Sequence, residues 1–279
     1  MKRFITNNWL KLSVGIFANV LGLSVLVGYA GAQGMQPPAP VHDSFSIVSK
    51  AVGESRLINV HTPAGYDTNA KTRFPVLYMP DGGIDEDFPH VVKSVDSLIA
   101  LGVIRPVIVV GIPNTQRRRD LTGPTTVHSD SAIAPKVGGS ADFRRFIKDE
   151  LIPAIDKRYR TTDERSIIGE SLAGLFIVES FLSEPELFDH YIAFDPSLWW
   201  NKGSLVDSAA AHLKSFDRRR PTLFLSASHD GIDDTTRLAG ILKAGKTKGA
   251  VWVFWSRPDL SHATIFAGMG PSGLAWSLR

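Results

Sequence analysis

The sequence predicts a single α/β domain in which a mostly parallel sheet of eight strands is flanked by helices on both faces. Runs rich in β-branched and aromatic residues alternate along the chain with amphipathic runs, which is typical of parallel sheets covered by helices. Of the 279 residues, 43% are hydrophobic and 21% are charged, a composition typical of a globular protein that buries one large core. No internal repeat or low-complexity tract interrupts the pattern.

The first 32 residues have the features of a secretory signal peptide. Lys2, Arg3 and Lys11 precede the apolar run 12–30, which ends at the small residues Ala30-Gly31-Ala32, a typical cleavage site. The alternative is an uncleaved membrane anchor, because the run approaches the ~20 residues that span a bilayer. We expect cleavage after Ala32 and a periplasmic or secreted protein, with membrane contact only through this leader if it is uncleaved.

Net charge and cysteine content narrow the classes of partner. Residues 1–32 contain three basic and no acidic residues, and the whole chain has a formal net charge of +3, so the mature protein is expected to be neutral. Neither nucleic acid nor anionic lipid is therefore favoured as a partner, and we expect a small-molecule substrate. The chain contains no cysteine, which excludes disulfides, thiol catalysis and cysteine-ligated zinc.

The expected elements follow in order after the leader. Three prolines indicate an extended linker over residues 33–43, and the folded domain is expected to span residues 44–279. Helical periodicity is clearest over 140–159 and 172–182. The Gly- and Pro-rich stretch 114–138 lacks such a period and is expected to form a long surface loop over the carboxyl ends of the strands, where open α/β sheets bind ligands. Strands are expected at 45–52, 57–62, 74–79, 106–112, 166–168, 191–194, 222–226 and 251–255.

A nucleophile elbow is predicted at Ser171. A short β-rich run leads into Gly169-Glu170-Ser171-Leu172-Ala173-Gly174, and an amphipathic run follows. A serine hydroxyl becomes reactive when a sharp strand-to-helix turn exposes its oxygen to a base and aims backbone N–H groups at the developing oxyanion. Small residues at 169 and 173 leave room for the turn, although Ala173 replaces the second glycine of G-x-S-x-G. The alternative is an ordinary turn in which Ser171 caps the helix.

His262 is the predicted general base. In the fold that carries such an elbow, the chain order is Ser, then Asp or Glu, then His, and the histidines after Ser171 are His190, His212, His229 and His262. His190 directly precedes an expected strand and His212 lies in a helical run, which favours surface positions for both. His262 follows the last expected strand in a short polar loop before a helix, and from that position a base can reach the elbow.

The acid that orients the imidazole is expected in a loop after a strand that precedes His262. Asp230 is the first carboxylate after the seventh expected strand and is the preferred candidate. Asp195, after the sixth expected strand, is the alternative, and Asp233 and Asp234 are expected to cap the next helix. The acidic cluster lacks the alternating spacing of an EF-hand loop, so we expect no metal, and the sequence indicates no cofactor.

Two backbone N–H groups are expected to form the oxyanion hole. One is the N–H of Leu172, which follows from the elbow, and the other is expected in the loop after the third strand. This loop contains Asp81-Gly82-Gly83, where glycine lets the backbone approach a substrate closely. Gly83 or Gly82 is therefore the expected donor. Asp81-Gly82 is also a common turn dipeptide, so a purely structural role is the alternative.

These motifs resemble an esterase family of the α/β-hydrolase superfamily that includes enterochelin (enterobactin) esterases, feruloyl esterases, S-formylglutathione hydrolases and mycolyltransferases. The resemblance covers most of residues 44–270, and the motifs look most like those of the enterochelin (siderophore) esterases. It implies a triad of Ser171, Asp230 and His262, and a substrate pocket floored by Trp199 and Trp200. The motifs are the elbow, Phe74-Pro-Val-Leu-Tyr-Met-Pro-Asp-Gly-Gly83, Gly111-Ile-Pro-Asn-Thr-Gln-Arg-Arg-Arg-Asp-Leu-Thr122 and Phe194-Asp-Pro-Ser-Leu-Trp-Trp-Asn201.

Arg117, Arg118 and Arg119 form a basic run after the fourth expected strand. Guanidinium groups suit planar anionic oxygens, so one interpretation is that this run binds a polyanion such as a ferric catecholate. The alternative is a solvated charge run in which Arg119 pairs with Asp120. Both interpretations stay open at this point.

The sequence thus predicts an exported serine esterase that cleaves carboxylic esters through an acyl-enzyme, with a siderophore lactone as the candidate substrate. Two related enzymatic alternatives are an acyltransferase, in which an alcohol replaces water as the acceptor, and a carbohydrate or feruloyl esterase. A third alternative is a non-catalytic siderophore- or glycan-binding protein. The intact order of Ser, Asp and His argues against this third alternative.

Overall fold

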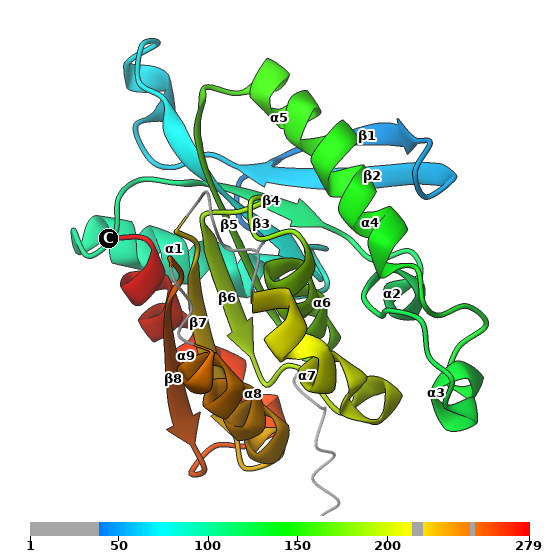
Figure 1. The fold of residues 1–279 in the computed structure, drawn as a ribbon. Coiled ribbons are helices and arrows are strands. Elements are labelled where there is room, and N and C mark those ends of the chain that lie inside the picture. Colours follow the sequence, from blue (N-terminus) through cyan, green and yellow to red (C-terminus); the bar gives the residue numbers. More distant parts are fainter. Residues whose placement is uncertain (1–38, 214–219, 246–248) are drawn as a thin grey trace, which may run out of the picture. The chain divides into compact units, whose positions relative to one another are not determined.

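The computed structural model describes residues 39–213, 220–245 and 249–279 (Figure 1). The predicted signal peptide, residues 1–32, and most of the predicted linker, residues 33–43, lie outside this part of the chain. Within it, no helix is both long enough and apolar enough to cross a membrane. The last linker residue, Asp43, already belongs to a strand and pairs with Val60.

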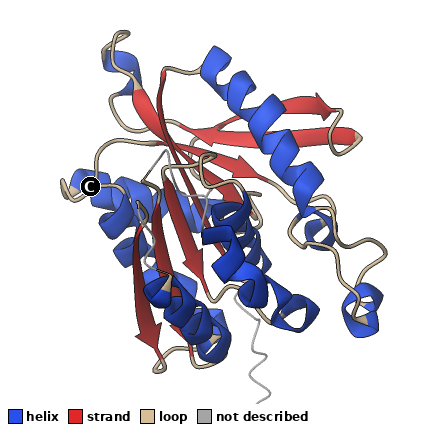
Figure 2. Cartoon of the chain, in the orientation of Figure 1, coloured by secondary structure: helices blue, strands red, loops and turns tan. Residues whose placement is uncertain are grey.

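The described strands form one eight-stranded sheet, as predicted (Figure 2). Their order is β1-β2-β4-β3-β5-β6-β7-β8. The pairs β1–β2 and β2–β4 are antiparallel, and every pair from β4 to β8 is parallel. The carboxyl ends of the parallel strands therefore meet at one edge of the sheet. The bounds are β1 (Asp43–Ser49), β2 (Glu54–His61), β3 (Phe74–Pro80), β4 (Ile108–Ile112), β5 (Thr161–Glu170), β6 (His190–Phe194), β7 (Thr222–Ser228) and β8 (Val251–Arg257).

Helices cover both faces of this sheet (Figure 1). One face is covered by α1 and α9, whose apolar residues share a buried cluster with residues of the central strands. The other face is covered by α4 to α8, which contribute to a second and larger cluster. The bounds are α1 (Phe88–Ala100), α4 (Ser140–Phe146), α5 (Ile152–Arg158), α6 (Leu172–Ser183), α7 (Trp200–His212), α8 (Ile232–Ala244) and α9 (His262–Ser277).

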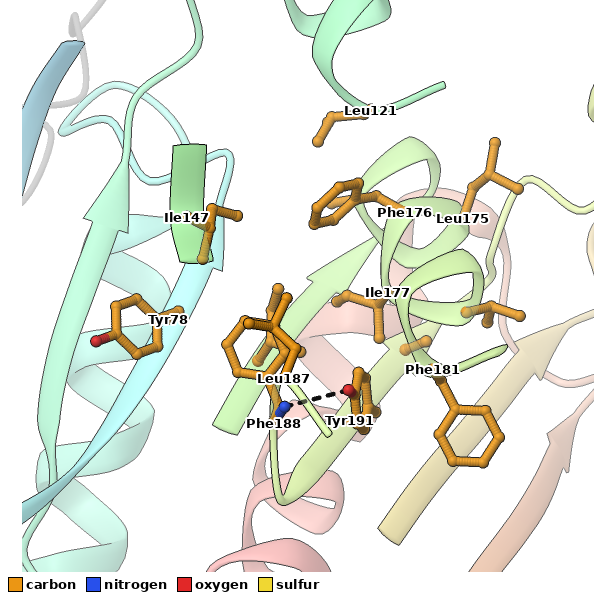
Figure 3. Close-up of a cluster of buried hydrophobic side chains, with 14 of the residues drawn as sticks. Tyr78, Leu121, Ile147, Leu175, Phe176, Ile177, Phe181, Leu187, Phe188 and Tyr191 are labelled. Carbon is orange, nitrogen blue, oxygen red and sulfur yellow. Dashed lines mark hydrogen bonds between the residues drawn. The ribbon is translucent and has the colours of Figure 1, made fainter. Parts of the chain in front are cut away.

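The larger cluster fixes α6 against the sheet. Phe176 and Phe181 of α6 lie in the same apolar layer as Tyr78 of β3 and Tyr191 of β6 (Figure 3). The Tyr191 hydroxyl accepts a hydrogen bond from the Phe188 N–H at 3.2 Å and donates to the Glu184 carbonyl at 3.0 Å. Buried aromatic side chains make large contributions to core stability when their polar atoms are satisfied, so the helix after the elbow is firmly held.

The helix predicted over residues 140–159 is interrupted by a π-helical segment. This segment, Ile147–Leu151, joins α4 to α5, and Pro153 follows in the first turn of α5. Proline lacks an N–H and clashes with the carbonyl four residues earlier in a regular α-helix. A local widening of the helix removes this conflict. Because α4, the π-helical segment and α5 follow one another without a break, periodicity alone predicted one continuous helix.

The stretch 114–138 is less irregular than predicted, because it contains two short helices, α2 (Arg117–Asp120) and α3 (His128–Ala132). An ion pair between Asp120 and Arg56 holds this stretch against β2, with 2.5 Å between Arg56 Nη1 and Asp120 Oδ2. Both side chains are 1% exposed. A buried, fully paired charge resists removal from its site, so one end of this long connection is fixed to the sheet.

Candidate active site

Ser171 lies in a sharp turn between β5 and α6, as predicted. Its backbone has φ 60° and ψ −120°, a conformation that costs energy for any residue with a side chain. The turn is held on both sides, because the Ser171 N–H donates to the Phe194 carbonyl and the Ser197 N–H donates to the Ser171 carbonyl, both at 3.0 Å. Strain that the surrounding structure enforces in this way is typical of catalytic turns.

The glycine before this turn compensates for the alanine after it. A Cβ atom added to Gly169 would lie 2.6 Å from the Cβ of Ala173, closer than two carbon atoms can approach. The methyl group of Ala173 therefore fits because residue 169 has no side chain. This contact explains how the elbow tolerates alanine in place of the second glycine of G-x-S-x-G.

His262 is the first residue of α9, directly after the loop that follows β8. Its Nδ1 atom lies 3.1 Å from Oδ2 of Asp195, which follows β6. The Asp195 side chain is fully buried and also accepts hydrogen bonds from the Ser228 N–H at 2.6 Å and the Ser228 hydroxyl at 2.5 Å. Asp195 is therefore held as a hydrogen-bond acceptor for the imidazole, with Nε2 left for another partner.

This geometry corrects the expected acid. Asp230, the preferred candidate, accepts a hydrogen bond from the backbone N–H of His262 at 2.7 Å, whereas the ring is bound by the alternative, Asp195. The parallel sheet makes either contact possible, because the carboxyl end of β6 lies beside that of β7 at the same edge. The loops over that edge decide which carboxylate meets the ring. Asp233 and Asp234 lie in the first turn of α8 after the N-cap Gly231, so neither is the cap itself.

The Ser171 hydroxyl has Ser197 as its nearest polar partner, with 3.4 Å between the two Oγ atoms. Among the described residues, no hydrogen bond joins Ser171 to His262. Catalytic hydrogen bonds in unliganded hydrolases are often long and tighten when substrate binds. The arrangement brings Ser171, His262 and Asp195 to one edge of the sheet without closing the contact between Ser171 and His262.

The N–H groups of the two glycines expected at the oxyanion hole have different hydrogen-bond partners. The Gly82 N–H donates to the Ile112 carbonyl at 3.1 Å, and a Cβ atom at Gly82 would lie 2.1 Å from the Ile112 nitrogen, so Gly82 joins β3 to β4 and is not a donor for substrate. The Gly83 N–H donates to Glu86 Oε2 at 2.7 Å. Leu172 is the first residue of α6, where an N–H has no partner within the helix.

The three arginines of the basic run have separate environments. Arg117 forms a bidentate pair with Asp81, at 2.7 and 2.8 Å. Arg119 pairs with Asp120 at 2.6 Å and with Glu54 at 2.7 Å. Arg118 donates to the carbonyl of Ile133 at 2.5 Å and has no acidic partner among the described residues. The expectation that all three bind an anion is therefore corrected, because two of the charges are already neutralised.

Arg118 lines a surface pocket of about 640 Å³ together with Lys136. Lys136, like Arg118, has no acidic partner within the described ranges. Arg117 and Arg119 also contribute to the wall of this pocket. Arg118 of the basic run and Lys136 thus place two cations without an acidic partner, among the described residues, in one pocket.

The two tryptophans face different surroundings, as expected for adjacent residues. Trp200 is 4% exposed, and its Nε1–H donates to the Gly123 carbonyl at 2.9 Å. Trp199 is 53% exposed. Trp200 therefore ties α7 to the loop after β4, and it also lines a surface pocket together with Leu175 and Ser204. The expectation that both rings floor a substrate pocket stays a prediction. The exposed Trp199 ring lies on the surface, where a ligand can contact it.

Comparison with known proteins identifies the family. Residues 49–246 match the family model described as "Putative esterase". The chain belongs to this esterase family. A solved structure of an IroE-like serine hydrolase from Shewanella oneidensis shares the fold with a TM-score of 0.76 and 25% identity, covering 86% of this chain and 79% of that one. The siderophore hydrolase EstB from Aspergillus nidulans gives a TM-score of 0.72 at 21% identity. The predicted α/β-hydrolase fold is confirmed.

Two curated relatives match parts of this chain. The ferri-bacillibactin esterase BesA of Bacillus subtilis is 39% identical over 114 residues, which cover 36% of this chain and 39% of that protein. The siderophore triacetylfusarinine C esterase of Aspergillus fumigatus is 29% identical over 193 residues, which cover 64% of this chain and 63% of that protein. The matches thus span less than two thirds of either relative.

The electrostatics of the candidate site depend most on His262. The hydrogen bond to Asp195 raises the pKa of the imidazole above its ordinary value, and the negative charges of Glu170, Asp195 and Asp230 add to the rise. Burial would raise the pKa of Asp195, but its hydrogen bonds with His262 and Ser228 bring the pKa below the ordinary value. Asp195 is therefore ionised and stabilises a protonated imidazole.

Glu170 is a site residue that the sequence analysis did not single out. Burial raises the pKa of its carboxyl to about 7; the charges of Asp87 and Asp195 add to this rise, while His262 and Arg117 oppose it. Its Oε1 atom is buried without a hydrogen-bond partner. Its position directly before the nucleophile is the signal that could have found it.

Ser228 and Glu86 were also missed. Each makes a contact between loops that are distant in the chain, Ser228 with Asp195 and Glu86 with Asn114. Glu86 also accepts the N–H of Gly83 within its own loop. Neither stands in a motif that marks its role, so the sequence carries no signal for these two residues.

Proposed function

We propose that this chain is a serine esterase that hydrolyses a carboxylic ester of the siderophore class through Ser171, His262 and Asp195. The observation that carries the proposal is the contact between the imidazole and a buried carboxylate beside a strained nucleophile elbow. A carboxylate at Nδ1 fixes the tautomer in which Nε2 accepts a proton. The family and the esterase activity of the relatives support ester hydrolysis, and the siderophores that these relatives act on support the siderophore class.

In the proposed reaction, the Ser171 hydroxyl attacks the ester carbonyl while His262 Nε2 takes its proton. The new oxyanion receives hydrogen bonds from the Leu172 N–H and from the Gly83 N–H, which Glu86 must first release. The tetrahedral intermediate collapses, and the alcohol leaves with the proton from His262. Water then attacks the acyl-enzyme with His262 again as base, which releases the acid and restores Ser171.

The Arg118 and Lys136 pocket supplies a second part of the proposal. Two cations without acidic partners favour an anionic group, and Arg presents several donors to planar oxygens. We propose that this pocket holds the anionic part of a ferric siderophore while its ester reaches Ser171. Exposed Trp199 is the proposed apolar contact for an aromatic ring of the substrate.

We also propose that residues 1–32 direct export of the protein. N-terminal sequencing of protein recovered from the periplasm tests this proposal.

The test of the central proposal is hydrolysis of a substrate panel by the wild-type protein and by Ser171→Ala. The panel contains ferric and iron-free triscatecholate lactones, feruloyl esters and short p-nitrophenyl esters. The proposal expects the lactones to be cleaved with the highest kcat/KM, and Ser171→Ala to lose turnover and labelling by a fluorophosphonate probe. A Ser171→Ala protein that still hydrolyses esters at the wild-type rate would show that Ser171 is not the nucleophile.

A further inference from the structure

The first helical residue of α9 is held by a carboxylate from another loop. Asp230, which follows β7, accepts the backbone N–H of His262 at 2.7 Å. The first N–H groups of a helix have no partner within it, and a carboxylate at this end also interacts favourably with the helix dipole. Asp230 thus binds the residue that carries the imidazole, 32 positions further along the chain.

The residue before Asp230 ties the same two loops together a second time. The His229 N–H donates to the Leu260 carbonyl at 3.3 Å, and His229 Nδ1 lies 2.6 Å from the same oxygen. His229 Nε2 lies 3.2 Å from Asp230 Oδ1, the carboxylate oxygen that does not bind His262. The loop after β7 therefore holds the entrance of α9 at two successive residues.

Asp230 is also connected to the acid that binds the ring. Its N–H donates to Ser228 Oγ at 3.2 Å, and Ser228 Oγ donates to Asp195 Oδ2 at 2.5 Å. The same Asp195 oxygen lies 3.1 Å from His262 Nδ1. His262 is consequently held at its ring by Asp195 and at its backbone by Asp230, and Ser228 links the Asp195 carboxylate to the Asp230 backbone.

We propose that Asp230 is a positioning residue for the esterase reaction, which fixes the backbone of His262 while Asp195 fixes its ring. The bond to Asp195 alone does not fix the position of the ring, because the side-chain torsions of His262 can rotate when its Cα atom moves. The contact between Ser171 and His262 is open, so the reaction is sensitive to such a shift. Misplacement of a catalytic group by about 1 Å can cost roughly a hundredfold in rate. This inference rests on the proposed function.

The test compares Asp230→Ala with Asp230→Asn on a short p-nitrophenyl ester, with kcat and KM measured across pH. Alanine removes both the hydrogen-bond acceptor and the charge, whereas asparagine keeps an acceptor oxygen and loses the charge. We expect Asp230→Ala to lower kcat about tenfold to a hundredfold with KM nearly unchanged. Asp230→Asn should keep most of the wild-type kcat, because its acceptor oxygen remains. The acid limb of its kcat/KM profile should lie at lower pH than in the wild type, because a charge that raises the pKa of His262 is gone.

Asp233→Ala and Asp234→Ala are the matched controls, because they remove carboxylates from the neighbouring first turn of α8. Both should keep wild-type kcat. The proposal is overturned if Asp230→Ala keeps wild-type kcat, or if Asp230→Asn is as impaired as Asp230→Ala. Should Asp230→Ala fail to fold, Asp230→Asn decides alone: a retained kcat with a displaced acid limb supports the proposal, and a lost kcat without displacement overturns it.

Ser171→Ala and Asp195→Asn separate this inference from the function on which it rests. If Ser171→Ala remains active, the proposed function fails whatever Asp230 does. If Asp230→Asn loses activity as severely as Ser171→Ala while Asp195→Asn retains it, Asp230 is the acid itself and the positioning role is wrong.

Discussion

Asp195 Oδ2 lies 3.1 Å from His262 Nδ1, although 67 positions separate the two residues in the chain. The contact exists because β6 and β7 are parallel neighbours and α9 begins at the same edge of the sheet. As a consequence, the carboxylate that contacts the ring comes from the loop after β6, and the carboxylate after β7 accepts the backbone N–H of His262.

Replacement of Asp195 by Asn should reduce turnover about 10⁴-fold, because an amide at this position favours the wrong imidazole tautomer. Asp233→Asn is the control, since its carboxylate lies in the first turn of α8. The measurement is kcat on a p-nitrophenyl ester, with circular dichroism to verify folding. Near-normal turnover in folded Asp195→Asn would refute the assignment of the acid.

The Arg118→Gln, Lys136→Gln double variant should bind a ferric triscatecholate lactone more weakly. Charge-assisted hydrogen bonds contribute ~1.5–3 kcal/mol each, so we expect KM to rise about tenfold or more with kcat nearly unchanged, and the difference to shrink at high salt. A neutral aryl ester should show no change. Lys71→Gln is the control, because Lys71 is exposed before β3, at the opposite edge of the sheet. Equal effects on both substrates would contradict an anion-binding role.

The pH dependence of kcat/KM should reflect the raised pKa of His262. The imidazole must be neutral to accept a proton, so activity should rise with pH through a pKa above the ordinary value for histidine. Glu170→Gln removes a negative charge that favours the protonated imidazole. The acid limb should therefore move to lower pH in this variant, and a limb at the wild-type position would show that Glu170 does not influence His262.

Asp120→Ala should destabilise the fold severely. Arg56 and Asp120 are each 1% exposed, and removal of Asp120 leaves the buried Arg56 guanidinium with Glu54 as an acidic partner at 2.9 Å. Breaking a buried ion pair costs about 3–5 kcal/mol, and the contact with Glu54 should place the loss toward the lower end of this range. Asp142→Ala breaks the exposed pair with Arg145 and should cost less than about 1 kcal/mol. Urea unfolding measures both free energies. Similar values for the two variants would show that the buried pair does not anchor the loop after β4.

The sequence by itself determined the strands, the elbow and the base, because each is encoded in a short local pattern. Alternation of β-rich and amphipathic runs predicted the eight strands in nearly their observed positions. Ser171 was found from its glycine-rich turn, and His262 from its place after the last strand. Such signals depend only on neighbours in the chain.

Only the tertiary structure decided which carboxylate meets the imidazole and which cations stay unpaired. Asp195 and Asp230 both follow strands that end at the same edge, and their separation from His262 depends on how the loops fold over that edge. Arg117 and Arg119 are adjacent to Arg118 in the chain, yet they are neutralised by Asp81 and Glu54 from other strands and loops. These pairings are made across the sheet by residues far apart in the chain, so no local pattern specifies them.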